Sequence, residues 1–158
     1  MLTHLPISSE IGKILSSKNK TLAVAESCTG GYLSHLITSI SGSSAYFKGG
    51  IIAYDNAIKI SHLNVSEETL KKFGAVSIEC AKEMAACVLK KFDVDYALST
   101  TGIAGPTGET PGKPLGTVCI AIATKEKIIA ERFQFKGSRK EVIEQSANKA
   151  LEMLLKVV

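Results

Sequence analysis

The feature that most limits the fold of this sequence is the alternation of short apolar runs with segments of helical periodicity. TLAVA (21–25) and DYALST (95–100) have the composition of buried strands, and GGIIAYD (49–55) indicates a third. Between them, YLSHLITSI (32–40) and SIECAKEMAACVLKKF (77–92) repeat apolar residues with the spacing of helices. TVCIAIAT and KIIAERFQF follow each other closely, as in a hairpin. We therefore predict a three-layer α/β/α sandwich with a mixed sheet.

Capping residues mark the ends of several predicted helices. Ser66 and Ser77 precede helical segments, and Gly74 ends the first of these. Ser138 and Glu141 have the spacing of a capping box, in which each side chain accepts from the other residue's backbone. Besides 32–40 and 77–92, the expected helices are one within 7–20, one at 66–74 and one at about 139–156.

The bulk composition restricts the partners of the chain. Its 158 residues predict one domain, covering 1–158, with a core of its own. The net charge is +4, but the basic residues are spread along the chain and aromatics make up only 6%, so we expect no nucleic-acid partner. No apolar run approaches the ~20 residues of a membrane span, and MLTHLPISSE lacks the plan of a signal peptide. We expect a cytoplasmic protein that does not bind membranes.

We expect neither a metal ion nor an organic cofactor. The four cysteines form no Cys-x-x-Cys pair and the three histidines are scattered, so metal-ligand spacing is absent from the sequence. The two glycine-rich stretches match neither the Walker A motif nor the dinucleotide fingerprint. ATP and NAD are therefore not expected ligands.

Three predicted strands end in polar or glycine residues. These ends are Glu26–Ser27, Tyr54 and Thr100–Gly102. In open α/β sheets, ligands bind at the carboxyl ends of the strands, so we expect these residues to meet in one pocket.

The first of these ends, AESCTGG (25–31), has two interpretations. Glycines before a helix let an anion approach free N–H groups, but they also occur in plain tight turns. The hydroxyls of Ser27 and Thr29 favour binding. Either Ser27 or Cys28 is a candidate nucleophile. Because neighbouring residues that leave a strand point in opposite directions, we expect only one of the two to face the pocket.

The other two ends add a candidate base and a second loop. Tyr54 and Lys59 follow the second strand, and a desolvated lysine can serve as a general base. From the residues alone, an ordinary surface lysine is the better interpretation. TTGIAGP, after the third strand, again combines hydroxyls with glycines. Arg139 opens the last helix, where it faces either solvent or a phosphate.

In combination, the motifs AESCTGG, GSSAYFKGGIIAYDNAIK, GAVS, TGIAGPTG and KPLGTV resemble the CinA C-terminal domain family, from about residue 8 to the end. The resemblance implies a three-layer α/β fold and usually a dimer. It also implies hydrolysis of nicotinamide mononucleotide to nicotinate mononucleotide and ammonia, in pyridine nucleotide salvage. A small nucleotide substrate and a homodimer are thus the expected partners.

Residue by residue, Ser27 matches the family's nucleophile, and Tyr54 and Lys59 match its assisting residues. Backbone N–H groups near Thr29–Gly31 or Gly102 are candidates for holding the oxyanion, and the phosphate would occupy the other glycine-rich site. The expected substrate-binding residues are Thr29, Gly30, Gly31, Asn56, Thr101, Gly102, Ile103, Ala104, Gly105 and Arg139.

The sequence departs from the family pattern in two respects. Many relatives have a second arginine where this chain has Ile143, which would weaken or rearrange substrate binding. Longer members also carry an additional N-terminal domain, which we do not expect here. The alternative function is a catalytically inactive nucleotide-binding or partner-binding domain of the same fold, which would bind nucleotide without releasing ammonia.

Overall fold

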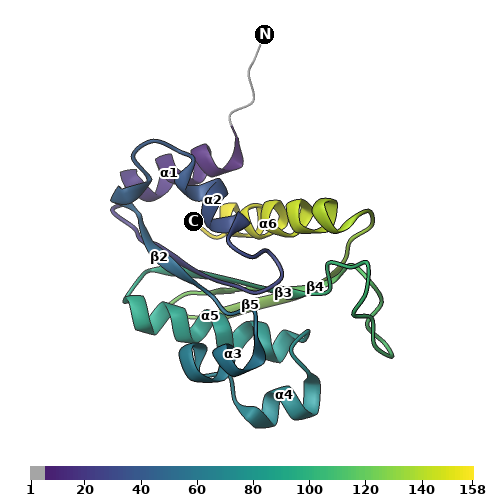
Figure 1. Ribbon diagram of the computed structural model, residues 1–158. Coiled ribbons are helices and arrows are strands. Elements are labelled where there is room, and N and C mark those ends of the chain that lie inside the picture. Colours follow the sequence, from purple (N-terminus) through teal and green to yellow (C-terminus); the bar gives the residue numbers. More distant parts are fainter. Residues whose placement is uncertain (1–5) are drawn as a thin grey trace.

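The computed structural model describes residues 6–158, which form a five-stranded sheet between two layers of helices (Figure 1). In spatial order, the strands are β2 (Phe47–Ile52), β1 (Leu22–Glu26), β3 (Tyr96–Gly102), β4 (Thr117–Ala123) and β5 (Ile128–Gln134). Strand β1 pairs in parallel with β2 and β3, whereas β4 is antiparallel to β3 and β5. The predicted α/β sandwich with a mixed sheet is confirmed.

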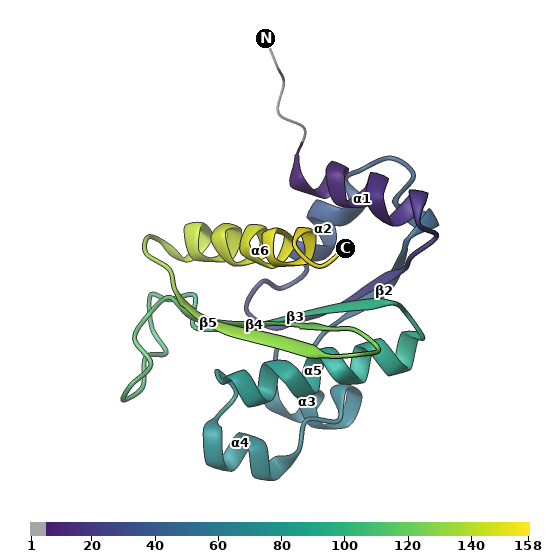
Figure 2. The same cartoon turned by 180° about the vertical axis from the view of Figure 1, so that it is seen from behind.

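The helices divide between the two faces of the sheet (Figure 2). One layer holds α1 (Ile7–Ser17), α2 (Tyr32–Thr38) and α6 (Arg139–Leu155). The other holds α3 (Asn56–Leu63), α4 (Glu67–Phe73) and α5 (Ile78–Phe92). A short 3-10 helix, Ser43–Ala45, precedes β2. No helix within residues 6–158 has both the length and the apolar character needed to cross a membrane.

The central strand β1 contributes to both hydrophobic cores. Leu22 and Val24 pack in the core beneath α1, α2 and α6, while Ala23 and Ala25 pack in the core beneath α5. All five β1 side chains are buried, as expected for a strand covered on both faces. The last of them, Glu26, is a carboxylate at the point where the sheet meets the candidate site.

The predicted N-caps Ser66, Ser77 and Ser138 and the predicted terminator Gly74 are all confirmed, but one helix was not predicted. Ser77 accepts from Cys80 N at 3.1 Å, and Ser138 forms the capping box with Glu141. Strand β2 ends at Ile52 rather than at residue 55, because Asp55 caps the unpredicted helix α3 by accepting from Ala57 N at 2.7 Å. The segment after β2 therefore turns back as a helix.

Candidate active site

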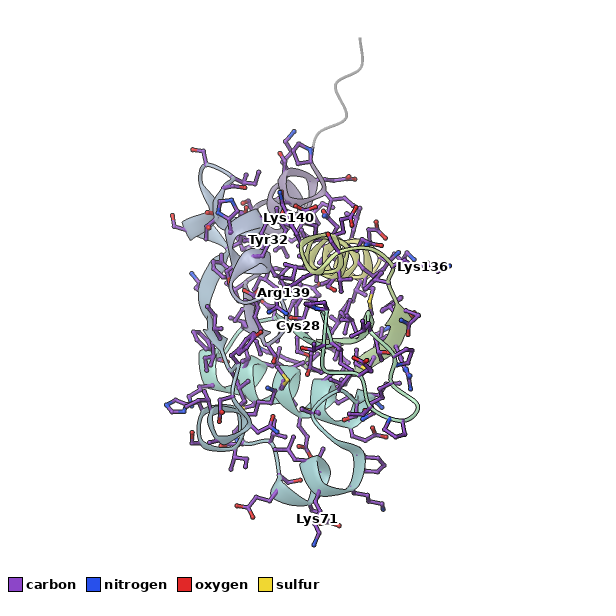
Figure 3. The ribbon with its side chains drawn as sticks, turned by 45° about the vertical axis from the view of Figure 1, so that its right-hand side comes forward. Cys28, Tyr32, Lys71, Lys136, Arg139 and Lys140 are labelled. Atoms are coloured by element: carbon purple, nitrogen blue, oxygen red, sulfur yellow. The ribbon has the colours of Figure 1, made fainter. Side chains whose placement is uncertain are left out.

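A cleft of about 260 Å³ lies at the carboxyl ends of β1 and β3, beside the segment that follows β2. Each of the three segments predicted to meet reaches this cleft, through Ser27, Tyr54, and Thr101 with Gly102, whereas Glu26 and Thr100 do not border it. Figure 3 shows Cys28 and Arg139, from separate elements, on the same side of the molecule. The cleft is lined by Ser27, Cys28, Tyr54, Asn56, Lys59, Ala75, Val76, Thr101, Gly102, Ile103, Ala104, Thr107, Gly108 and Arg139.

Ser27 is held firmly by its backbone while its hydroxyl stays free. Its N–H donates to Thr100 O at 2.9 Å, and the carbonyl of the preceding Glu26 accepts from Ala53 N at 2.8 Å. Both neighbouring strand ends thus fix the chain at this point. The Ser27 side chain is 7% exposed and borders the cleft, and its hydroxyl makes no hydrogen bond to another group within residues 6–158. A fixed backbone with an uncommitted hydroxyl suits a nucleophile.

Lys59 is a buried side chain and not the surface lysine that its local sequence favoured. Helix α3 carries it into the cleft with 2% of its surface exposed. Its Nζ donates to the main-chain carbonyl of Tyr54 at 3.2 Å. Burial lowers the pKa of the amine, because desolvation disfavours the charged form. An amine with a lowered pKa, in the same cleft as a free serine hydroxyl, is a candidate general base in its unprotonated form.

Cys28 also borders the cleft, so the expectation that only one of the two neighbours would do so is wrong. The alternation of side chains applies within β1, which ends at Glu26, and does not extend into the turn that follows. Cys28 also packs in the first core, with 6% of its surface exposed. Burial raises the pKa of its thiol to about 12, which leaves little thiolate at neutral pH.

The predicted anion cradle at Thr29–Gly31 is already occupied by the carboxylate of Glu26. Oε1 of Glu26 accepts from Thr29 Oγ1 at 2.6 Å and from Gly31 N at 3.2 Å, while Gly30 N donates to Ser27 O at 3.1 Å. None of Thr29, Gly30 and Gly31 borders the cleft. Gly31 has a φ of 103°, a left-handed conformation that favours glycine. These glycines therefore shape the turn, and their N–H groups are not available to a ligand.

The loop after β3 brings most of its predicted residues to the cleft. The Thr101 hydroxyl donates to Ala75 O at 2.8 Å, which ties the end of β3, just before this loop, to the segment before α5. A Cβ on Gly102 would lie 2.6 Å from Val118 Cγ2, so the close approach of β4 requires glycine there. Ile103 and Ala104 line the cleft, whereas Gly105 does not.

Arg139 bridges two of the segments that border the cleft. Its Nη1 donates to Gly105 O at 2.8 Å and its Nη2 donates to the Tyr54 hydroxyl at 2.7 Å. Tyr54 is 59% exposed, and its hydroxyl contacts Arg139 whereas Lys59 contacts only its carbonyl. Asn56 also lines the cleft. Ile143 is half-buried against the first core and does not border the cleft.

The cleft also offers backbone donors that the sequence did not reveal. Cys28 and Ala104 both border it, and their N–H groups donate to no other group within residues 6–158. The N–H groups of Thr107 and Gly108, farther along the same loop, are likewise uncommitted within that range. The motif TGIAGPTG marked this loop as unusual, but which of its amides are free depends on the pairing of β3 with β4.

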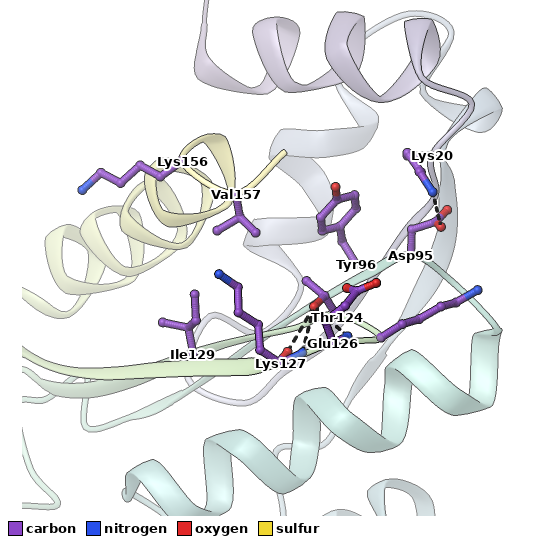
Figure 4. Close-up of a pocket in the computed structure, with 10 residues that line it drawn as sticks. Lys20, Asp95, Tyr96, Thr124, Glu126, Lys127, Ile129, Lys156 and Val157 are labelled. Carbon is purple, nitrogen blue, oxygen red and sulfur yellow. Dashed lines mark hydrogen bonds and ion pairs between the residues drawn. The ribbon is translucent and has the colours of Figure 1, made fainter.

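A second cleft, of about 490 Å³, lies at the opposite ends of the same strands (Figure 4). Its Lys20–Asp95 ion pair measures 3.0 Å, and Asp95 also accepts from the backbone N–H and the hydroxyl of Thr21. Because these donors hold the carboxylate, it fixes the start of β1 against β3. None of the predicted site residues lies there. Residues 6–158 contain no cluster of three His, Cys, Asp or Glu side chains suited to a metal ion.

Comparisons with known proteins agree with this architecture. The family model of the CinA C-terminal domain matches residues 4–158. A CinA-like protein from Endomicrobium trichonymphae is 49% identical over 148 residues, which are 94% of this chain and 35% of that protein. The chain thus spans about a third of the length of the curated relatives it matches.

Solved structures of similar proteins superimpose on this chain over nearly their whole length. A CinA superfamily protein from Escherichia coli superimposes with a TM-score of 0.93 at 30% identity, covering 96% of this chain and 88% of that one. A competence/damage inducible protein from Agrobacterium tumefaciens gives a TM-score of 0.89 at 33% identity, covering 99% and 98%.

Proposed function

The chain belongs to the CinA C-terminal domain family, and we propose that it hydrolyses the carboxamide of nicotinamide mononucleotide, giving nicotinate mononucleotide and ammonia. The observation that carries the proposal is the presence, in one cleft, of the free hydroxyl of Ser27 and the buried amine of Lys59. The family resemblance supplies the substrate, and the geometry of the cleft supports hydrolysis by a serine with a lysine base.

In the proposed reaction, Ser27 Oγ attacks the carboxamide carbon and its proton passes to Lys59 in the unprotonated form of the amine. The lysine returns this proton to the nitrogen as the C–N bond breaks, so that ammonia leaves and an acyl-enzyme forms. Water then attacks the acyl carbon, again with Lys59 as base, and the carboxylic acid and free Ser27 are released. No step uses a metal ion or an organic cofactor.

We propose that the proton moves directly between Ser27 and Lys59 and not through Tyr54. The Tyr54 hydroxyl is engaged by Arg139 at 2.7 Å, and Lys59 contacts the main chain of Tyr54 instead. Tyr54 is also the one aromatic side chain that borders the cleft within the described residues. Its ring is therefore our candidate for packing against the pyridine ring of the substrate.

We assign the oxyanion and the phosphate to different parts of the cleft. The uncommitted N–H groups of Cys28 and Ala104 match an arrangement known from α/β-hydrolases, in which the residue after the nucleophile and a second loop hold the oxyanion. Each such donor contributes about 3 kcal/mol to transition-state stabilisation. We assign the phosphate to Arg139, Thr107 and Gly108, because the Glu26 carboxylate already accepts from the N–H groups at the start of α2.

The deciding experiment is an ammonia-release assay on nicotinamide mononucleotide, nicotinamide riboside and free nicotinamide, with Ser27→Ala as the matched control. We expect turnover of the mononucleotide, much weaker turnover of the other two compounds, and none in the control. Binding of the mononucleotide without ammonia release would favour a catalytically inactive nucleotide-binding domain. Equal turnover of all three compounds would refute a site that reads the phosphate.

We also propose a homodimer, which rests on the family resemblance. Sedimentation velocity at micromolar concentration is expected to show a species of twice the 16.8 kDa chain mass. A monomer alone across this range would refute the dimer without affecting the proposed chemistry.

A further inference from the structure

Glu26 is a fully buried carboxylate directly before the proposed nucleophile, and it collects five hydrogen bonds. Oε1 accepts from Thr29 Oγ1, Gly31 N and Leu33 N, at 2.6, 3.2 and 2.9 Å. Oε2 accepts from the N–H and the hydroxyl of Ser34, at 3.0 and 2.6 Å. Every donor belongs to the turn or to the first residues of α2, and the carboxylate does not border the cleft.

The carboxylate links the two ends of the turn that carries Ser27. Glu26 belongs to β1, whose backbone is fixed by β2 and β3 on either side. Its side chain holds the far end of the turn at Gly31, Leu33 and Ser34. Thr29 adds a second tie, because its hydroxyl also lies 2.7 Å from Thr100 Oγ1. The four residues between these anchors therefore have little freedom to move.

We propose that Glu26 is a positioning residue for the Ser27 nucleophile, a role that rests on the proposed amidase function. Its carboxylate acts as a built-in anion at the start of α2, so that the donors there cannot capture the substrate's oxyanion or phosphate. The same bonds orient the turn so that the Ser27 hydroxyl and the Cys28 N–H remain uncommitted at the cleft. The residue would thus act on the reaction through Ser27 and not through the substrate.

A glutamine at position 26 tests this role with almost no change in volume. Its amide has one oxygen and one NH₂ group, so one of the two positions now occupied by carboxylate oxygens must present N–H groups to N–H donors. At the Oε2 position, for example, the amide would face the Ser34 N–H. The start of α2 must shift to relieve this contact, and Ser27 shifts with it.

The experiment compares Glu26→Gln with Asp95→Asn, a matched control at the other end of β1 and β3. Asp95 also accepts three hydrogen bonds, from Lys20 Nζ and from the N–H and hydroxyl of Thr21, but it lies in the second cleft. Both variants are measured for thermal unfolding and for kcat and KM with nicotinamide mononucleotide. We expect kcat of folded Glu26→Gln to fall about 100-fold, as for a misplacement of roughly 1 Å, with KM changed less than about threefold.

Asp95→Asn is expected to lower the unfolding temperature while kcat of the folded protein stays at the wild-type value. An unchanged kcat in folded Glu26→Gln, or equal losses of kcat in both variants, would overturn the positioning role. If Glu26→Gln does not fold, Ser34→Ala decides, because it removes one hydroxyl donor and keeps the carboxylate.

We expect kcat of Ser34→Ala to fall about tenfold with KM unchanged, the effect of one hydrogen bond to a charged group, and an unchanged kcat would refute the role. A wild-type protein that releases no ammonia would refute the proposed function and the role of Glu26 with it. An active wild type with an unaffected Glu26→Gln would refute the role of Glu26 alone.

Discussion

Replacing Lys59 with methionine is expected to make the protein more stable and inactive at the same time. Lys59 is 2% exposed, and the only hydrogen bond of its amine within residues 6–158 goes to Tyr54 O at 3.2 Å. Exchanging buried charged groups for apolar ones of similar volume often stabilises by roughly 1–4 kcal/mol. The lost hydrogen bond offsets about 1 kcal/mol of this. The net gain is about 1 kcal/mol, which raises the unfolding temperature by about 2–4 °C in a chain of this size.

The pH dependence of this gain identifies its cause. Burial lowers the pKa of Lys59 in the folded protein, so the unfolded chain binds the proton more tightly. In the wild type, the free-energy cost of burying the Lys59 amine is fully present below the pKa of this amine in the folded protein, and it declines as the pH rises above that value. It is absent above the pKa of the unfolded lysine, about 10.4. The difference in unfolding temperature between Lys59→Met and wild type is therefore expected to shrink from pH 7 toward pH 10.

The assays are calorimetric unfolding across this pH range and ammonia release from nicotinamide mononucleotide. Loss of a general base is expected to lower kcat by at least about 100-fold. In the wild type, kcat/KM should rise with pH, with a midpoint below the ordinary lysine pKa. Lys71→Met, at an exposed position on α4 (Figure 3), is the matched control and should change neither property. A less stable Lys59→Met with a pH-independent difference would refute the reasoning.

Substitutions at four residues test the remaining assignments. Ser27→Ala should abolish ammonia release, whereas Cys28→Ala should retain it. The opposite result in the two variants would make the Cys28 thiol the nucleophile. Tyr54→Phe should retain most of kcat because it keeps the ring, whereas Tyr54→Ala should raise KM; an equal loss of kcat in both would restore the hydroxyl to the proton route. Arg139→Gln should raise KM for nicotinamide mononucleotide by roughly 10–100-fold, the effect of a lost hydrogen bond to a charged group. The riboside, which has no phosphate, should respond little to this change, and equal effects on both substrates would contradict a phosphate contact.

The architecture could be predicted from the sequence because each strand and most helices carry their own local signals. The apolar run 21–25 is too short for a typical helix and is followed by glycines, and the observed β1 differs from it by one residue at each end. Helix α3 was not predicted, since its eight residues follow the strand after only three others. Its capping residue Asp55 was included in the strand instead. This error hid the fact that α3 directs Lys59 into the interior.

The position of the candidate site could be predicted from the sequence, but which of its donors are free for a ligand could not. Glycines after a strand predict free N–H groups, yet the pattern cannot show which anion accepts from them. In this chain the acceptor is Glu26, whose side chain reaches the donors of Gly31, Leu33 and Ser34 only once α2 has packed beside β1. The burial of Lys59 is likewise a tertiary effect, because YDNAIK by itself is typical of an ordinary surface lysine.

The groups that favour function over stability are concentrated at one end of the sheet. At the amino ends of β1 and β3, the carboxylate of Asp95 is paired with a lysine and two further donors. At the carboxyl ends, Lys59 is buried without a salt-bridge partner within residues 6–158 and the Ser27 hydroxyl is uncommitted. Buried charges normally have partners, and buried polar groups are normally hydrogen-bonded. A fold that satisfies Glu26 with five donors, one residue away, could have satisfied these groups as well. The Ser27 hydroxyl, and the N–H groups of Lys59 beyond its one bond to Tyr54 O, are therefore left for a substrate, which is the requirement that the proposed amidase reaction places on this cleft.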